Sequence, residues 1–386
     1  MSVFAELVGQ SHIVLALQDA VAASRNGEES QEMTHAWLFT GPPGSGRSSA
    51  AVAFAAALIC PEGGCGNCID CRTAQAGGHA DVEIVRTEGL SIKVDEIREL
   101  LQRVAWAPIV GGWRVVVMED ADRLTESAAN ALLKAIEEPG ARTVWLLCAP
   151  TLFDVLPTIR SRTRHLQLRT PSTEEVAEVL IRRDGVSPGM ADFAARVSQG
   201  HIGRARHLAN DESIRSRRNS IMNLPFTLTS LAAAFSAAAT LVELATEEAN
   251  TQSVARSEKE SRDLGEAWGQ GATGRGMAAG GAKALKELEK EQKSRATRMV
   301  RDSLDGALLD LATFYRDVLV LQFSSTASTA SILNRELEKK ITEIAENTQP
   351  AKILDKLNAI MRARTSLSYN AAPLLTIEAL MCALSQ

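Results

Sequence analysis

The segment 41–48 has the sequence GPPGSGRS, which places three glycines within six residues. It follows the apolar run 36–40 and precedes the alanine-rich segment 49–58, which favours a helix. Between a strand and a helix, a glycine-rich turn lets backbone N–H groups and the helix start surround a phosphate. The sequence therefore predicts a phosphate-binding loop with contacts from Gly41, Gly44, Gly46, Arg47 and Ser48.

Position 47 of this loop is arginine, where such loops normally carry lysine. A lysine ammonium is a compact charge on a flexible stem, whereas a guanidinium is planar and bulkier, so the two are not equivalent at a phosphate. Two interpretations stay open: a loop that binds ATP with Mg²⁺, and a loop kept for its structure. Arg47 favours the second, because efficient hydrolysis is doubtful without the lysine.

The apolar run 113–118 ends in Glu119 and Asp120. At the end of a buried strand next to a phosphate-binding loop, such carboxylates hold Mg²⁺ and orient the attacking water. The usual order, aspartate then glutamate, is transposed here. One methylene moves a carboxylate by about one ångström, which impairs the positioning of water. The alternative is a solvated strand end with no role in chemistry.

Four of the six cysteines fall within twelve residues: Cys60, Cys65, Cys68 and Cys71. Their spacing is C-x4-C-x2-C-x2-C, and the glycines among them allow turns tight enough for four thiolates to converge. Four cysteine ligands form a closed tetrahedral site of the kind that holds structural Zn²⁺. We therefore expect zinc. Reduced thiols are the alternative, and they are what we expect for Cys148 and Cys382, which lie in apolar runs.

Apolar runs at 36–40, 81–85, 113–118 and 143–148 alternate with helical patterns, which is typical of an α/β domain with a mainly parallel sheet. After Pro171 the strand signals fade, and Ser172 to Glu175 is typical of a capping box at a helix start. These patterns predict three regions: an α/β domain at 1–170, a short helical region at 171–210 and a helical region at 211–386. We expect the helices of the short region to end near 200–203.

The last region is interrupted at 265–281 by a glycine-rich insertion, which we expect to form a flexible loop between two helices. The charged pattern 283–301 next to it predicts a helix, most simply one with a solvated face. The 386 residues carry a formal net charge of −5, so the chain is not expected to grip nucleic acid unaided. The start has no secretory leader pattern, and the run 231–242 is too short and too rich in alanine to span a membrane. These features favour a cytoplasmic location with no membrane partner.

Ser161 and Arg162 follow the segment 156–160, and an arginine there is either solvated or reaches into a neighbouring nucleotide site. Further motifs precede them: VGQ at 8–10, ADRL at 121–124 and ANALLKAIEEP at 129–139. With the loop and the cysteines, these motifs resemble bacterial clamp-loader subunits of DNA polymerase III. The resemblance covers residues 8 to about 165, and the motifs keep the family's order.

Three departures from that family's pattern favour its delta-prime branch over the ATP-hydrolysing gamma/tau branch. Arg47 replaces the lysine, Ala149 and Pro150 fill the sensor-1 position, and Gly203 stands where the sensor-2 arginine belongs, with Arg204 one residue late. Each change removes a group that would touch the γ-phosphate. Arg162, in contrast, matches the family's Ser-Arg-Cys arginine finger, although Thr163 replaces the cysteine.

The resemblance implies an AAA+ α/β domain with the zinc module at 60–71, a helical lid at 171–210 and a helical collar at 211–386. It also implies a hetero-pentamer with gamma/tau and delta subunits, which opens the β sliding clamp and places it on primed DNA for the polymerase holoenzyme. In that assembly the chain is a stator that lends Arg162 to a neighbour and hydrolyses little or no ATP itself, while DNA is contacted through the complex.

Two other readings remain. One is an active ATPase of the gamma/tau type, in which Arg47 substitutes for lysine. The other is a stand-alone zinc-module nucleic-acid binder, which the absence of aromatic residues near the cysteines disfavours, since only Arg72 is basic there.

Overall fold

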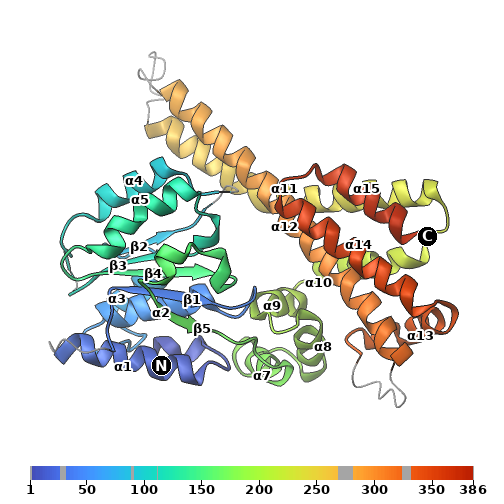
Figure 1. Ribbon diagram of the computed structural model, residues 1–386, viewed down its shortest axis with the longest axis horizontal. Helices are drawn as coiled ribbons and strands as arrows, with labels where there is room; N and C mark the ends of the chain where they lie inside the picture. Colours follow the sequence, from blue (N-terminus) through green and yellow to red (C-terminus); the bar gives the residue numbers. More distant parts are fainter. Residues whose placement is uncertain are drawn as a thin grey trace. The chain divides into compact units, whose positions relative to one another are not determined.

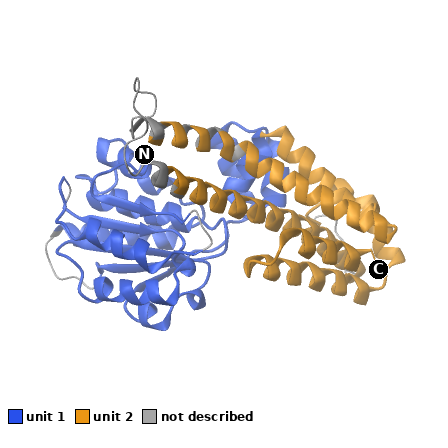
Figure 2. Cartoon of the chain, turned by 90° about the horizontal axis from the view of Figure 1, so that it is seen from above, with its two compact units in different colours: residues 1–210 blue, residues 211–386 orange. Residues whose placement is uncertain are grey.

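The computed structural model describes residues 2–26, 32–87, 91–110, 112–267, 281–323 and 332–385. These residues form two compact units, 1–210 and 211–386 (Figure 2). The expected division of the first unit into a nucleotide-binding domain and a lid, and the collar role of the second, stay predictions. Among the described ranges, no helix combines the length and the hydropathy needed to cross a bilayer.

The first unit contains a five-stranded sheet with helices on both faces (Figure 1). Its strands are β1 (Ala36–Thr40), β2 (Val82–Val85), β3 (Arg114–Met118), β4 (Thr143–Ala149) and β5 (Arg164–Gln167). Its helices are α1 (Ser11–Asn26), α2 (Arg47–Ile59), α3 (Ile69–Gln75), α4 (Val94–Val104), α5 (Glu126–Glu137), α6 (Pro157–Arg160), α7 (Thr173–Asp184), α8 (Pro188–Ser198) and α9 (Ile202–Asn210). Short 3-10 turns lie at η1 (Val3–Glu6), η2 (Ala121–Arg123) and η3 (Leu152–Asp154).

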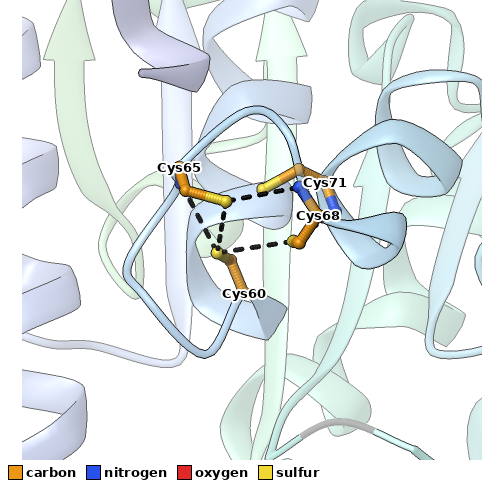
Figure 3. A group of neighbouring side chains, drawn as sticks. All are labelled: Cys60, Cys65, Cys68 and Cys71. Atoms are coloured by element: carbon orange, nitrogen blue, oxygen red, sulfur yellow. Dashed lines mark hydrogen bonds between the residues drawn. The ribbon is translucent and has the colours of Figure 1, made fainter. Parts of the chain in front are cut away.

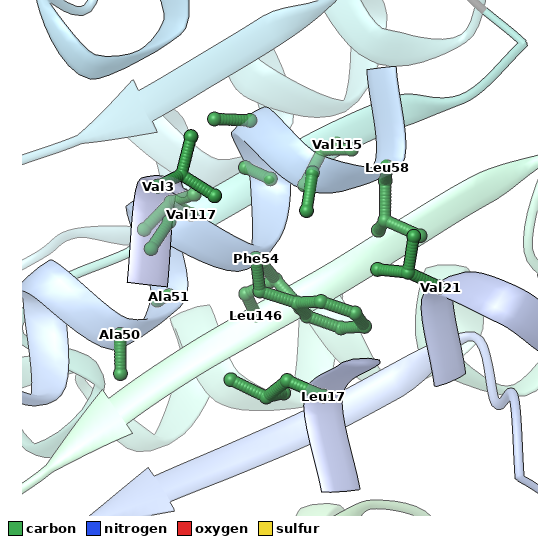
Figure 4. Close-up of a cluster of buried hydrophobic side chains, with 14 of the residues drawn as sticks. Val3, Leu17, Val21, Ala50, Ala51, Phe54, Leu58, Val115, Val117 and Leu146 are labelled. Atoms are coloured by element: carbon green, nitrogen blue, oxygen red, sulfur yellow. The ribbon is translucent and has the colours of Figure 1, made fainter. Parts of the chain in front are cut away.

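The strand order is β2-β3-β4-β1-β5, and every pairing is parallel. In the interior strand β1, Trp37 and Phe39 pack into a core formed with α1 and α2, whereas Leu38 packs into a second core with α4 and α5. Figure 4 shows part of the first core, with Leu17 of α1 and Phe54 of α2. A strand covered on both faces needs apolar residues at every position, which is why these strands are continuous apolar runs. The predicted parallel α/β sheet is confirmed.

The four predicted strands are present, and β5 is an addition. Its sequence, RHLQ, alternates half-buried and exposed positions because it pairs only with β1 at the edge of the sheet. An edge strand of this kind lacks the continuous apolar run that marked the other strands. It is still part of the site, because its end leads to Leu168 beside the loop: the backbone N–H of Leu168 donates to the Thr40 carbonyl at 2.7 Å.

The predicted capping box opens α7. The Ser172 hydroxyl accepts the backbone N–H of Glu175 at 3.2 Å, and the Glu175 carboxylate accepts that of Ser172 at 2.8 Å.

The expectation that the helices end near 200–203 is wrong. Gln199 and Gly200 form a left-handed turn, with φ of 51° and 86°, and the chain resumes a helix at Ile202.

The described part of the second unit is helical. Its elements are α10 (Glu212–Asn223), η4 (Leu224–Phe226), α11 (Leu231–Ala267), α12 (Gly281–Phe323), η6 (Arg335–Leu337), α13 (Glu338–Asn347), α14 (Pro350–Ser368) and α15 (Pro373–Leu384). The long helices α11 and α12 lie side by side (Figure 1) and meet the shorter ones in a core around Phe314. Most of the glycine-rich insertion predicted at 265–281 lies outside the described residues, since α11 ends at Ala267 and α12 begins at Gly281.

Candidate functional site

The glycine-rich segment 41–48 forms a loop between the end of β1 and the start of α2. Gly44 and Gly46 have φ of 84° and 90°, a region that L-residues with a side chain avoid, and Gly46 is the N-cap of α2. The backbone N–H of Gly41 donates to the carbonyl of Pro150 after β4, at 3.1 Å. The loop therefore lies where the carboxyl ends of β1 and β4 meet, at the N-terminus of a helix.

Two polar atoms in this loop are shielded from solvent and have no hydrogen-bond partner among the described residues: Ser45 Oγ and Arg47 Nη1. The Ser45 hydroxyl turns inward toward Gly41, since a methyl group on Gly41 would lie 2.6 Å from its oxygen. A buried polar atom without a partner costs about 1–3 kcal/mol. The loop therefore keeps two unpartnered polar groups beside a helix N-terminus, which is the kind of donor chemistry that suits a phosphate group.

Gln10 supports the loop from a distant part of the sequence. Its side-chain amide donates to the Arg169 carbonyl at 2.7 Å, and its side-chain carbonyl accepts the Arg169 backbone N–H at 3.2 Å. The same amide lies 3.4 Å from the carbonyl of Ser45. Gln10 is thus a structural tie between the loop and the segment after β5, a role that sequence reasoning did not assign to it.

The turn between α8 and α9 packs directly on the loop. A methyl group on Gly44 would lie 2.4 Å from Cγ of His201 and 2.6 Å from its Cα, so no side chain fits between them. Burial, aided by the charge of Arg204, lowers the pKa of His201 below its ordinary value, and its Nδ1 accepts the Arg204 backbone N–H at 3.1 Å. A neutral imidazole therefore covers Gly44. Sequence reasoning missed His201, because nothing local marks this contact.

The two acids after β3 are engaged by arginines of the chain. Glu119 Oε1 lies 3.1 Å from Arg86 Nε, and Asp120 Oδ1 lies 3.9 Å from Arg123 Nε. Burial raises the pKa of the nearby Asp122, a shift that the charge of Arg47 opposes. The Arg47 guanidinium thus lies within electrostatic reach of the acids at the strand end. Glu119, expected on the metal side of the site, is instead neutralised by Arg86.

The two positions expected to lack sensor residues contribute only small or backbone groups. Pro150 offers its carbonyl to Gly41, as described above, and Gly203 lies in the first turn of α9. A methyl group on Gly203 would lie 3.3 Å from Cε1 of His201. The space that a longer side chain at 203 would occupy is therefore bordered by the His201 ring.

Arg162 lies on the surface just after α6. Its Nε is 2.6 Å from Glu137 Oε1, and its Nη1 donates to the Thr158 carbonyl at 2.9 Å and to the Ser161 hydroxyl at 3.1 Å. The side chain remains 40% exposed. The guanidinium therefore contacts α6, its C-cap Ser161 and the end of α5, while part of it stays accessible.

The four clustered cysteines converge on one point at the end of α2 and the start of α3 (Figure 3). Cys60 Sγ lies 3.7 Å from the sulfurs of Cys65 and Cys68, and all four sulfurs lie within 4.8 Å of one another. A tetrahedral ion with Zn–S bonds of about 2.3 Å requires S–S separations of about 3.8 Å. The cluster therefore has the dimensions to hold a metal ion.

Backbone N–H groups point at these sulfurs. Cys60 Sγ accepts from Glu62 at 3.3 Å and from Cys65 at 3.4 Å, and Cys71 Sγ accepts from Gly66 at 3.4 Å. Burial acts to raise the pKa of the Cys60 thiol, but the N–H groups outweigh it and lower that pKa to about 6. Burial raises the pKa of Cys71. A cation among the sulfurs would favour the thiolate at both.

The cysteine module is built into the first unit. Cys60 and Cys71 are buried in the same core as α1 and α2, and the Val3 backbone N–H donates to the Gly64 carbonyl at 3.0 Å. Arg25 donates to the carbonyl of Cys60. The cluster therefore lies where the N-terminal segment, α1 and α2 meet, and a metal ion held there would tie these segments together.

The chain is similar to subunits of DNA polymerase III. Residues 17–172 match the protein family described as "DNA polymerase III, delta subunit". The delta' subunit of Bacillus subtilis is 33% identical over 195 residues, which are 50% of this chain and 59% of that protein. The delta' subunit of Pseudomonas aeruginosa is 40% identical over 134 residues, 33% of this chain and 41% of that protein.

The gamma/tau subunit of Mycobacterium bovis is 35% identical over 184 residues, which are 46% of this chain and 31% of that protein. The chain thus spans between about a third and three fifths of the length of these relatives. The glycine-rich loop, the parallel sheet and the order of the motifs agree with the resemblance to DNA polymerase III subunits noted in the sequence. The N-terminal part of the chain, whose parallel α/β sheet precedes a helical C-terminal part, is therefore similar to the delta' and gamma/tau subunits of DNA polymerase III.

Proposed function

We propose that the chain is the delta-prime subunit of the clamp loader: a stator that helps to load the β sliding clamp onto primed DNA. In this role it lends Arg162 to the ATP of a neighbouring subunit and hydrolyses little or no ATP itself. The observation that carries the proposal is the packing of His201 on Gly44, which closes the loop's surface there to a ligand. The pairing of Glu119 with Arg86 adds to it, because a carboxylate held by a guanidinium is a poor partner for Mg²⁺.

The surroundings of Arg162 suit a group that is lent to a partner. Exposed ion pairs such as Arg162–Glu137 contribute about 0–1 kcal/mol, so exchanging Glu137 for a phosphate costs little. An arginine that reaches a transferring phosphoryl group is worth about 10³ to 10⁵ in kcat at that site. The transition-state stabilisation that Arg162 can supply in the assembly therefore far exceeds the free energy of the ion pair that it gives up.

The other assignments of this proposal follow from the same reading. Zn²⁺ is the metal in the cysteine cluster, because four thiolates with no open position suit a structural zinc ion. The partners are gamma/tau and delta subunits in a hetero-pentamer, with the β sliding clamp and primed DNA as its targets. The place of action is the cytoplasm.

The test is the DNA-stimulated ATPase of the complex reconstituted with gamma/tau and delta. We expect Arg162→Ala to lower turnover at the site that it serves by about 10³-fold or more. Arg182→Ala is the matched control, because Arg182 is also an exposed arginine in a helix-surface ion pair, with Glu178 at 2.8 Å. Unchanged ATPase in an Arg162→Ala complex that still assembles would remove the finger role.

An active ATPase of the gamma/tau type is the second candidate. The observation in its favour is the pair of unpartnered atoms inside the loop, Ser45 Oγ and Arg47 Nη1, whose donor chemistry suits a phosphate group. This candidate requires that the isolated chain turns over ATP and that Asp120→Asn abolishes the turnover. An isolated chain that neither binds nor hydrolyses ATP would exclude it.

A further inference from the structure

The N-terminal turns of α12 carry a row of lysines along one side of the helix. Lys286, Lys290 and Lys293 are all exposed. With 3.6 residues per turn, their directions around the helix axis fall within about 60° of one another, and they span about 10 Å along the axis. We call these three residues the lysine face.

The lysine face points away from the helix that α12 packs against. On the other side, roughly 180–240° around the axis, the Gln292 amide donates to the Ser257 carbonyl of α11 at 3.0 Å. The buried Arg295 forms a two-pronged ion pair with Glu260 of α11, at 2.9 and 2.7 Å. The packing of α11 and α12 therefore does not use the lysines.

Glu289 stands three residues after Lys286 and four before Lys293, spacings at which opposite charges can pair on a helix. Among the described side chains, none of the three lysines forms an ion pair, although Glu289 and Glu291 are nearby and exposed. The arginines of the same helix behave differently: Arg298 Nε lies 3.5 Å from Asp302 Oδ2, and Arg295 is paired as above. Lys286 with Lys290, and Lys290 with Lys293, are like-charge neighbours, each costing about 0.2–0.5 kcal/mol.

We propose that the lysine face binds the phosphate backbone of duplex DNA. Ammonium groups in a row, which have no ion-pair partner among the described side chains, supply the sequence-independent charge contacts that duplex phosphates accept. The segment 281–301 contains no aromatic residue, so it lacks the stacking platforms that single strands require. The chain as a whole is acidic, at −5, so this concentration of lysines is local rather than a general basicity.

This inference goes beyond the proposed function, which places the DNA contacts in the assembly, and it does not depend on Arg162. It revises the expectation that 283–301 has only a solvated face.

Each phosphate contact contributes about −0.9 to the slope of log affinity against log salt, so three lysines contribute about −2.7. Between about 50 and 200 mM salt, that part of the affinity falls about 40-fold.

The experiment measures fluorescence anisotropy of a labelled duplex, with the isolated full-length chain titrated at several salt concentrations. We expect Lys286→Gln/Lys290→Gln/Lys293→Gln to reduce the magnitude of the salt slope by about 2.7. The control, Lys134→Gln/Lys339→Gln/Lys352→Gln, removes the same charge from three exposed lysines elsewhere and is expected to leave the slope unchanged. Replacing the lysine face by arginines is expected to preserve binding.

Circular dichroism establishes that the variants keep their helix content. Equal loss in both triple variants would show a general charge effect and overturn the proposal, as would an unchanged slope in the lysine-face variant. Tighter, less salt-sensitive binding to a single strand of equal length would overturn the choice of duplex DNA. The chain is tested alone, so failure here is distinct from failure of the Arg162 experiment, which requires the assembled ATPase.

Discussion

Gly44→Ala tests the contact between the α8–α9 turn and the loop, on which the proposed function depends most. The new methyl group would meet His201 Cγ at 2.4 Å and Cα at 2.6 Å, in a backbone with φ of 84°. The left-handed conformation costs a side chain about 1–2 kcal/mol, and an extra methyl group in a packed contact costs about 1–3 kcal/mol. We therefore expect a total loss of about 2–5 kcal/mol.

Gly46→Ala is a matched control two residues away. Gly46 has nearly the same φ, 90°, but a methyl group there meets no atom within 4 Å. This variant should therefore lose only the conformational part, about 1–2 kcal/mol. The difference between the two variants isolates the cost of overlapping with His201, about 1–3 kcal/mol.

The assay is urea unfolding of the full chain followed by tryptophan fluorescence, because Trp37 and Trp145 are buried in the first unit. Introducing His201→Gly removes the Cβ and Cγ that the new methyl group would meet, so the cost of Gly44→Ala should fall in that background. Since the Cα of residue 201 stays 2.6 Å from the new methyl group in that background, only part of the cost should be recovered. Equal losses for Gly44→Ala and Gly46→Ala would refute the packing of this turn on the loop.

Two further predictions concern the metal cluster and the pH dependence of the first unit. Removing the metal with a chelator, or replacing one ligand by Cys71→Ser, should cost about 4 kcal/mol of unfolding free energy at a metal concentration near 1,000 Kd. Calorimetry should then show a Tm lowered by roughly 8–16 °C, whereas Cys382→Ser outside the cluster should change the Tm little. A chelator without effect on the Tm would contradict a bound metal. Because the folded-state pKa of His201 is lowered by burial, the unfolded chain binds the proton more tightly, so the wild type should lose stability relative to His201→Gln as pH falls below about 6.5. Parallel pH profiles of the two proteins in urea unfolding would show that His201 titrates as in the unfolded chain.

Predictions from the sequence succeeded where the signal is local. The continuous apolar runs mark β1, β3 and β4 because these strands are covered on both faces, and Ser172 with Glu175 marks the start of α7 within four residues. The signal failed for β5, whose alternating polar sequence reflects its place at the sheet edge. It also failed at 200–203, where a left-handed turn, not an end of helical structure, separates α8 from α9.

The sequence by itself determined the glycine-rich loop, the parallel α/β sheet and the convergence of the four cysteines. The loop and the cysteine cluster each depend on residues at most a dozen positions apart, and the sheet is indicated by apolar runs that are each local. Only the tertiary structure decided what surrounds the loop. His201 reaches Gly44, Arg86 reaches Glu119 and Glu137 reaches Arg162 across segments that meet only when parallel strands and their connecting helices have packed. Such contacts follow from topology, and no short pattern in the chain encodes them.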